Sequence, residues 1–175
     1  SARSRACYYR HPRGSQTILM RGLYVITDTS VTDPDLLYRQ VSEAIDGGAS
    51  IVQFRHKTED KGLYYALAEA VLASCRQHGG PCLINDNALI AQTLGADGAH
   101  LGQTDGSLSE ARVNLGPGAI LGRTCHDSRS LMREAVRDGA TYCASVDFLS
   151  RRQNLAQADY RSSSFRNSLI NARSQ

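Results

Sequence analysis

A polar side chain occupies every second position within the segment IVQFRHK, residues 51–57. If this segment is a strand, its period of two places Gln53, Arg55 and Lys57 on one face and apolar side chains on the other. When the apolar face packs beneath helices, the polar face points into the protein. Burying two cations without a counter-charge is costly, so Arg55 and Lys57 require an anionic partner, either a protein carboxylate or a ligand.

Two carboxylates stand where they could share this site. Asp86 ends the segment LIND, and Asp105 follows the segment HLGQT. Two carboxylates beside cations are typical of a site for Mg²⁺ and pyrophosphate, in which oxygen atoms hold the metal and Arg and Lys neutralise the remaining phosphate charge. Arg would bind a phosphate with two hydrogen bonds, and Lys would act as a point charge. An internal cluster of salt bridges is the alternative interpretation.

The elements that must position these residues alternate between short apolar runs and helical periods from residue 22 to residue 146. This alternation is typical of βα units that build a parallel sheet. We expect strands at 23–28, 51–57, 81–86, 98–102, 119–126 and 142–145, and helices at 34–48, 62–80, 88–96, 107–116 and 130–140.

Short, regular βα units without long insertions favour an α/β fold of the (β/α)₈ TIM-barrel type, truncated to about six units. No GxGxxG follows the first strand, which argues against a dinucleotide-binding sheet, while a flavodoxin-like sheet remains an alternative. In a barrel, polar residues at the carboxyl ends of strands line the active site. Residues of this kind are Thr27 and Asp28, Arg55 to Lys57, Asn85 and Asp86, Gln103 and Asp105, and Thr124 to His126.

Some of these polar residues have a simpler explanation. Asp is a favoured helix cap at strand-to-helix turns, so we interpret Asp28, Asp33 and Asp127 as caps. The alternation places His56 on the helix-facing side of its strand, without a chemical role, while His126 stands at the carboxyl end of a strand. His100 is expected to be either a hydrogen-bonded interior residue or a site residue. Cys125 and Cys143 are expected to be small core residues.

The composition is that of a globular protein, and it excludes several classes. The net charge of +3 over 175 residues is too small to indicate nucleic acid, and no apolar run approaches the length of a membrane span. The five cysteines show no zinc spacing and are odd in number, which favours a reducing cytoplasm over a disulfide framework. The basic, acid-free residues 1–21 are predicted to be disordered or a non-native leader, although they also have the composition of an organellar transit peptide.

The segments GLYVITD, GASIVQFRHK, LINDN, LGADGAHLGQTD and ILGRTCH occur in the order and spacing of thiamine phosphate synthases. The chain resembles this family over about residues 22–144. The resemblance implies a TIM barrel that condenses hydroxymethylpyrimidine diphosphate with a thiazole phosphate, giving thiamine phosphate and pyrophosphate with Mg²⁺. Both substrates are small molecules, and the sequence leaves the oligomeric state open.

The resemblance also implies roles for the candidate site residues. Arg55 and Lys57 would bind the diphosphate, and Thr124 stands where the family usually has a serine that hydrogen-bonds the diphosphate. These three are therefore the candidate catalytic residues. In the family mechanism pyrophosphate leaves first, and the thiazole nitrogen captures the resulting pyrimidine-methyl cation. This step requires stabilisation of leaving-group charge rather than a protein nucleophile.

The remaining roles concern the pyrimidine and the metal. By the same resemblance, Gln53 and Asn85 would bind the pyrimidine-diphosphate substrate, and Asp86 and Asp105 would hold Mg²⁺. A thiazole tautomerase shares the barrel without the full diphosphate-binding set, and a non-catalytic protein that binds a phosphate ligand is a second alternative. The presence of all four charged residues favours the synthase.

The resemblance ends after Tyr142, where the family continues with a loop carrying Ser-x-Thr-Lys-Pro and two further βα units. Residues 147–175 show neither strand alternation nor a helical stripe and are predicted to be unstructured. A shift of reading frame near codon 143 can convert residues 152–155 into Thr-Lys-Pro, so we hypothesise an out-of-frame tail at 144–175. Without its last strands a barrel lacks a phosphate site, so the chain is expected to fold poorly and to be inactive.

Overall fold

The computed structural model describes residues 7–10, 17–20 and 22–145. Two short strands, β1 (Cys7–Arg10) and β2 (Thr17–Met20), pair antiparallel. The predicted tail at 147–175 lies outside the described residues, and so does most of the segment 1–21. No helix in the described part is long and apolar enough to cross a membrane.

The remaining strands form one six-stranded parallel sheet in the order β3-β4-β5-β6-β7-β8. Its strands are β3 (Leu23–Ile26), β4 (Ala49–Phe54), β5 (Cys82–Asn85), β6 (Gly98–Leu101), β7 (Ile120–Thr124) and β8 (Tyr142–Ala144). The helices between them are α1 (Pro34–Asp46), α2 (Lys61–His78), α3 (Ala88–Leu94), α4 (Leu108–Leu115) and α5 (Arg129–Arg137). Every predicted strand and helix of residues 22–146 is present.

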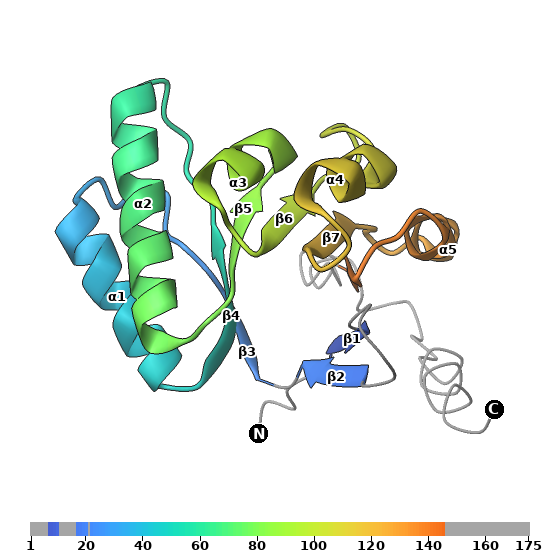
Figure 1. Ribbon diagram of the computed structural model, residues 1–175, viewed down its shortest axis with the longest axis horizontal. Helices are drawn as coiled ribbons and strands as arrows, with labels where there is room; N and C mark the ends of the chain where they lie inside the picture. Colours follow the sequence, from blue (N-terminus) through green and yellow to red (C-terminus); the bar gives the residue numbers. More distant parts are fainter. Residues whose placement is uncertain (1–6, 11–16, 21, 146–175) are drawn as a thin grey trace, which may run out of the picture.

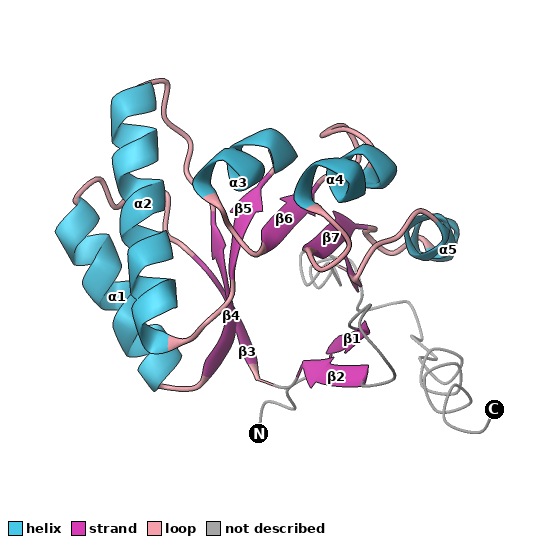
Figure 2. Cartoon of the chain, viewed as in Figure 1, coloured by secondary structure: helices cyan, strands magenta, loops and turns pink. Residues whose placement is uncertain are grey.

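The sheet curls with its helices along one side, as in part of a TIM barrel (Figure 1 and Figure 2). Each strand is hydrogen-bonded to its neighbours in the chain, so the order never reverses. A flavodoxin-like sheet would have a reversal and helices on both faces. The barrel prediction is therefore confirmed, and the flavodoxin-like alternative is wrong.

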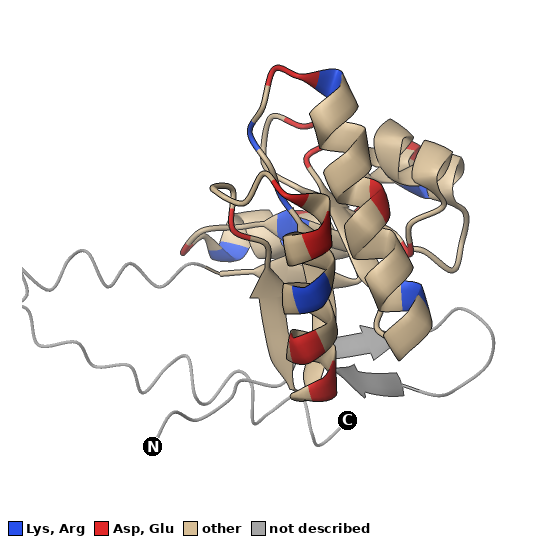
Figure 3. Cartoon of the chain, turned by 90° about the vertical axis from the view of Figure 1, so that its left-hand side faces the viewer, with Lys and Arg blue, Asp and Glu red and all other residues tan. Residues whose placement is uncertain are grey.

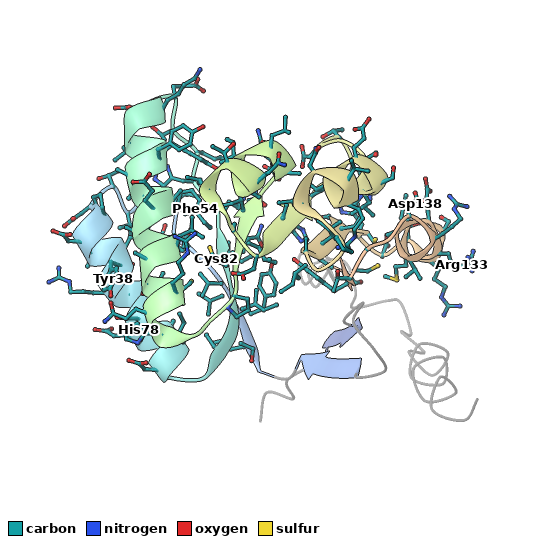
Figure 4. All side chains as sticks on the ribbon, in the orientation of Figure 1. Tyr38, Phe54, His78, Cys82, Arg133 and Asp138 are labelled. Carbon is teal, nitrogen blue, oxygen red and sulfur yellow. The ribbon has the colours of Figure 1, made fainter. Side chains whose placement is uncertain are left out.

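The main core lies between the outer face of the sheet and the helices. Val52, Phe54, Ile84 and Leu121 are fully buried and alternate with the residues that face the barrel interior. Figure 4 shows Phe54 and Cys82 inside this layer, while Arg133 and Asp138 project from the region of α5. Figure 3 shows acidic and basic positions on the outward surfaces of α1 and α2. This amphipathic pattern holds the helices against the sheet.

Polar side chains fix the start of each helix, close to the carboxyl ends of the strands. Asp33 accepts a hydrogen bond from the Asp35 amide at 2.9 Å and caps α1, as predicted. Asp28 caps a turn and not a helix, because its carboxylate accepts from the Ser30 amide at 2.9 Å. The prediction for Asp127 is wrong, since Ser128 caps α5.

The structure corrects the end of the strand that carries Gln53. This strand, β4, ends at Phe54, so Arg55 and Lys57 lie in the following loop and not on the strand face. The side chain of Thr27 explains the end, because its hydroxyl accepts from the Arg55 amide and donates to the Arg55 carbonyl, both at 2.9 Å. With both backbone groups of Arg55 bonded to a side chain, strand pairing stops there.

Candidate functional site

One side chain from each of the six strands joins a continuous chain of hydrogen bonds inside the curled sheet. We call this set the interior relay; in order it runs Asn85, Gln53, Tyr24, Tyr142, His100 and Thr124. Four of these side chains were candidate site residues from the sequence, namely Gln53, Asn85, His100 and Thr124. The fold therefore brings residues from distant parts of the chain into one connected group.

The first half of the interior relay links β5, β4 and β3. Gln53 donates from its Nε2 to Asn85 Oδ1, and the Tyr24 hydroxyl donates to Gln53 Oε1 at 2.9 Å. The Tyr24 hydroxyl also meets the Tyr142 hydroxyl at 2.7 Å, which connects the first strand of the sheet to the last. Gln53 is buried at 3% exposure, so its amide orientation is set by the protein.

His100 carries the relay on to Thr124. Its Nδ1 lies 2.8 Å from Tyr142 Oη, and its Nε2 lies 2.8 Å from Thr124 Oγ1. Burial lowers the pKa of His100 to about 4; the nearby charge of Asp105 raises it, and that of Arg123 lowers it further. His100 is therefore a neutral, hydrogen-bonded interior residue near neutral pH, which confirms one of the two interpretations of it.

A glycine leaves space for the interior relay, and an apolar cluster lies next to it on the side of the amino ends of the strands. A β-carbon at Gly122 would lie 2.2 Å from Tyr142 Oη and 2.5 Å from His100 Nδ1, so only glycine admits the bond between these side chains. Beneath the polar layer, Ile51 and Leu83 are buried with Tyr142 in a second small core. The interior is thus apolar toward the amino ends of the strands and polar toward their carboxyl ends.

Asp86 and Asp105 come together at the carboxyl ends of β5 and β6. The Asp86 residue is exposed as a whole, yet partial burial of its carboxyl group raises the pKa of that group, and so do the hydrogen bond to Asp105 and the charge of Asp105. The positive charges of Arg55 and Lys57 act in the opposite direction. The charges of Asp105, Arg55 and Lys57 therefore all act on Asp86, although no ion pair within 4.0 Å joins these residues in the described part of the chain.

The backbone around Asp86 is unusual for a residue with a side chain. Asp86 has a φ of 64°, in the left-handed region that favours glycine, and its amide donates to the His100 carbonyl at 2.8 Å. His126, which follows β7, has a φ of 49°. In the described part of the chain these are the two non-glycine residues with positive φ. Strained backbone of this kind persists where the surroundings fix it, often at functional sites.

The loop that carries Asp105 is held by β7. Arg123 donates from Nη1 to the carbonyls of Gly102 at 2.6 Å and Gly106 at 3.0 Å. Asp105 accepts from the Gly102 amide at 2.7 Å, and Gln103 donates to the Thr124 carbonyl. These contacts fix the position of the Asp105 carboxylate before any ligand arrives.

Asp86 and Asp105 are the candidate ligands for a metal ion in this site. The described residues contain no cluster of three or more His, Cys, Asp or Glu side chains able to hold a metal. The pair of Asp86 and Asp105 nevertheless fits Mg²⁺, because this ion is usually bound by one or two carboxylates, with waters and substrate phosphates completing its shell. A divalent cation would also relieve the repulsion between the two carboxylates.

The other candidate side chains lie outside this group. His56 stacks on Phe54 with ring centroids 6.5 Å apart, and its two ring nitrogens are buried without a hydrogen-bond partner in the described part of the chain. Its place beside Phe54 agrees with the predicted helix-facing position. Cys125 is fully buried, and burial raises the pKa of its thiol to about 12, so it is a core residue and not a nucleophile.

Three residues of the site were not found from the sequence. Tyr24 and Tyr142 belong to strands at opposite ends of the sheet, and no local pattern indicates that they meet. Arg123 lies between Gly122 and Thr124 on the strand face that turns toward the loop of Asp105. The sequence did offer one indication of a role for Arg123, because in the segment LGRTCH this charged residue directly precedes the predicted site residue Thr124.

The sheet order, the outer helices and the charged residues at the carboxyl ends of the strands define a TIM-barrel protein with a site suited to an anion and a divalent cation. Residues 23–150 match the family model described as thiamine monophosphate synthase. The chain belongs to this family.

Two relatives illustrate the membership. The chain is 41% identical over 125 residues to the thiamine-phosphate synthase of Nitrosococcus oceani, an alignment that covers 71% of this chain and 58% of the relative. It superimposes with a TM-score of 0.61 and 28% identity on the thiamine phosphate pyrophosphorylase of Pyrococcus furiosus, over 71% of this chain and 59% of that structure. The chain thus spans less than two thirds of either relative.

Proposed function

We propose that this chain provides the pyrimidine-diphosphate and Mg²⁺ site of a thiamine phosphate synthase. The reaction would condense hydroxymethylpyrimidine diphosphate with a thiazole phosphate to give thiamine phosphate and pyrophosphate. Both substrates are small, phosphorylated molecules. Location in the cytoplasm is part of this proposal, and the free thiols of Cys75, Cys82, Cys125 and Cys143 are compatible with it.

The observation that carries the proposal is the meeting of Asp86 and Asp105 beside Arg55 and Lys57. Two neighbouring carboxylates repel each other, and so do two neighbouring cations. A diphosphate with Mg²⁺ satisfies both pairs at once, because the metal neutralises the carboxylates and the phosphate oxygens neutralise the cations. Few other ligands have both charges in one compact unit.

In this proposal Asp86 and Asp105 hold Mg²⁺, and the bound ion supplies positive charge to the leaving pyrophosphate. Arg55 and Lys57 stabilise the negative charge that grows on the pyrophosphate as the bond to the pyrimidine methylene breaks. Gln53 and Asn85 orient the pyrimidine from the interior relay, with their amides already fixed before binding. Thr124 is the proposed hydroxyl partner at the diphosphate.

Isothermal titration calorimetry of the 175-residue chain with hydroxymethylpyrimidine diphosphate tests the binding site. We expect binding with Mg²⁺ present and little binding in the presence of a chelator. Chromatographic detection of thiamine phosphate after addition of the thiazole phosphate tests the condensation. Binding that is equal with and without Mg²⁺ would contradict the proposal.

A further inference from the structure

The interior relay has a single consistent direction of hydrogen-bond donation. The Tyr24 hydroxyl has one proton and donates it to Gln53 Oε1 at 2.9 Å. The proton in the 2.7 Å bond between Tyr24 and Tyr142 must therefore come from Tyr142. Because the Tyr142 proton is used in this way, Tyr142 can only accept from His100 Nδ1, 2.8 Å away.

This direction determines the state of His100 and then that of Thr124. A neutral imidazole that carries its proton on Nδ1 has a lone pair on Nε2. The Thr124 hydroxyl, 2.8 Å from Nε2, must then donate its proton to the ring. In this state Thr124 can accept a hydrogen bond from a ligand at the carboxyl end of β7, but it cannot donate one.

We propose that His100 is the positioning residue of Thr124, and that Tyr24, acting through Tyr142, fixes His100 as the Nδ1–H tautomer. Tyr24 acts on His100 indirectly. Because Tyr24 accepts the proton of Tyr142, Tyr142 must accept from His100 Nδ1, and this determines which ring nitrogen carries the proton. The proposal deepens the proposed function, because a phosphate oxygen can only accept. An anion at Thr124 therefore requires the Nε2–H tautomer, in which the ring donates to Thr124 and Thr124 donates to the ligand.

The two arrangements contain the same number of protons. In the change from the first to the second, the ring proton of His100 leaves Nδ1 for solvent and a proton from solvent binds Nε2, so that no net proton is gained or lost. In the second arrangement the Tyr142 hydroxyl donates to His100 Nδ1, and the Tyr24 hydroxyl donates to Tyr142 in place of Gln53 Oε1. Binding at Thr124 would thus release Gln53 Oε1 to accept from the ligand. The relay couples the diphosphate end of the site to the pyrimidine end through His100.

Nitrogen-15 NMR of the full chain with labelled histidine tests the tautomer without any ligand. The chain has five histidines, so the H100Q variant assigns the His100 signals. We expect a pyrrole-type Nδ1 and a pyridine-type Nε2 at neutral pH. The Y24F variant should give a mixture of tautomers, because the Tyr142 hydroxyl no longer has the Tyr24 oxygen as its acceptor and can also donate to His100.

The Y38F variant is the matched control, since the Tyr38 hydroxyl is exposed and donates to Gln77 at 2.6 Å, outside the relay. It should leave the His100 signals unchanged. A wild-type Nε2–H tautomer, or a Y24F variant with the wild-type tautomer, would overturn the proposal.

Magnesium pyrophosphate, added to the wild-type chain, separates this inference from the proposed function. We expect the His100 signals to change to those of the Nε2–H tautomer. Bound pyrophosphate with an unchanged tautomer would overturn the coupling. Failure of pyrophosphate to bind would count against the proposed function, while the spectra of the free wild type and Y24F would still decide whether Tyr24 sets the tautomer.

Discussion

The hydroxyl oxygens of Tyr24 and Tyr142 lie 2.7 Å apart, although 118 positions separate the two residues in the chain. Tyr24 lies on β3 and Tyr142 on β8, the two edge strands of the six-stranded sheet. A flat sheet would hold these strands far apart, since neighbouring strands are spaced by roughly 4.8 Å. The contact therefore requires the sheet to curl, and the same curl brings the residues of the candidate site together.

Substitution of Gly122 should damage this arrangement without touching a charged group. A methyl group in the G122A variant would lie 2.2 Å from Tyr142 Oη, so the ring or the strand must shift. We expect a loss of about 1–3 kcal/mol in the free energy of unfolding, measured by urea denaturation. The G118A control has open space around the added methyl group and should cost little. Equal stability of the two variants would show that the interior tolerates the displacement.

Arg55 is the first residue to test for diphosphate binding. We expect the R55Q variant to bind hydroxymethylpyrimidine diphosphate about ten- to a hundredfold more weakly, as for the loss of a charge-assisted hydrogen bond. The measurement is calorimetry in the presence of Mg²⁺. The R133Q control removes an exposed arginine of α5 and should keep wild-type affinity. If R133Q weakens binding as much as R55Q, general charge and not the site explains the affinity.

The D105N variant should alter both the proposed metal site and the pKa of Asp86. Without the charge and the hydrogen bond of Asp105, the pKa of the Asp86 carboxyl group should fall toward its ordinary value, as followed by carbon-13 NMR. Removal of this proposed carboxylate ligand should weaken Mg²⁺-dependent binding about tenfold or more. The D138N variant serves as the control at the end of α5.

The same pair should make the proposed Mg²⁺ binding of the wild type depend on pH. A carboxylate must lose its proton before it binds a metal. Because the pKa of Asp86 is raised, Mg²⁺ affinity should begin to fall at a higher pH than for an ordinary aspartate site, as the pH decreases through that raised value. Titrations at several pH values measure the onset, and an onset at the ordinary aspartate value would refute the expected coupling.

His100 should make the folded state less stable in mild acid. Its pKa is lowered from 6.5 to about 4, so between these values the unfolded chain binds more protons than the folded one. The free energy of unfolding should therefore decrease as the pH falls from 6.5 to about 4, by up to roughly 3 kcal/mol from this group. The H100Q variant should lack this part of the slope, and denaturation of both proteins at several pH values measures the difference. Parallel slopes would mean that His100 titrates normally.

The sequence was sufficient for the order of strands and helices because each βα unit is a local pattern. The polar ends of β5 and β6 were predicted for the same reason, and the structure brings Asp86 and Asp105 together there. The prediction for the end of β4 was wrong, since this end depends on the side chain of Thr27, which directly follows another strand, β3. The meeting of Tyr24 and Tyr142 depends on the curvature of the whole sheet, which no short segment contains.

The left-handed backbone at Asp86 limits which residues an engineer could place there. Glycine and asparagine adopt this conformation most readily, and neither has a carboxylate, while glutamate keeps the charge but tolerates the backbone poorly. Asp105 is free of this limit, since its φ is not positive. In a library of substitutions at position 86, the variants that suit the backbone would therefore differ from those that keep a carboxylate for the proposed metal. At position 105, stability and metal binding could be optimised together.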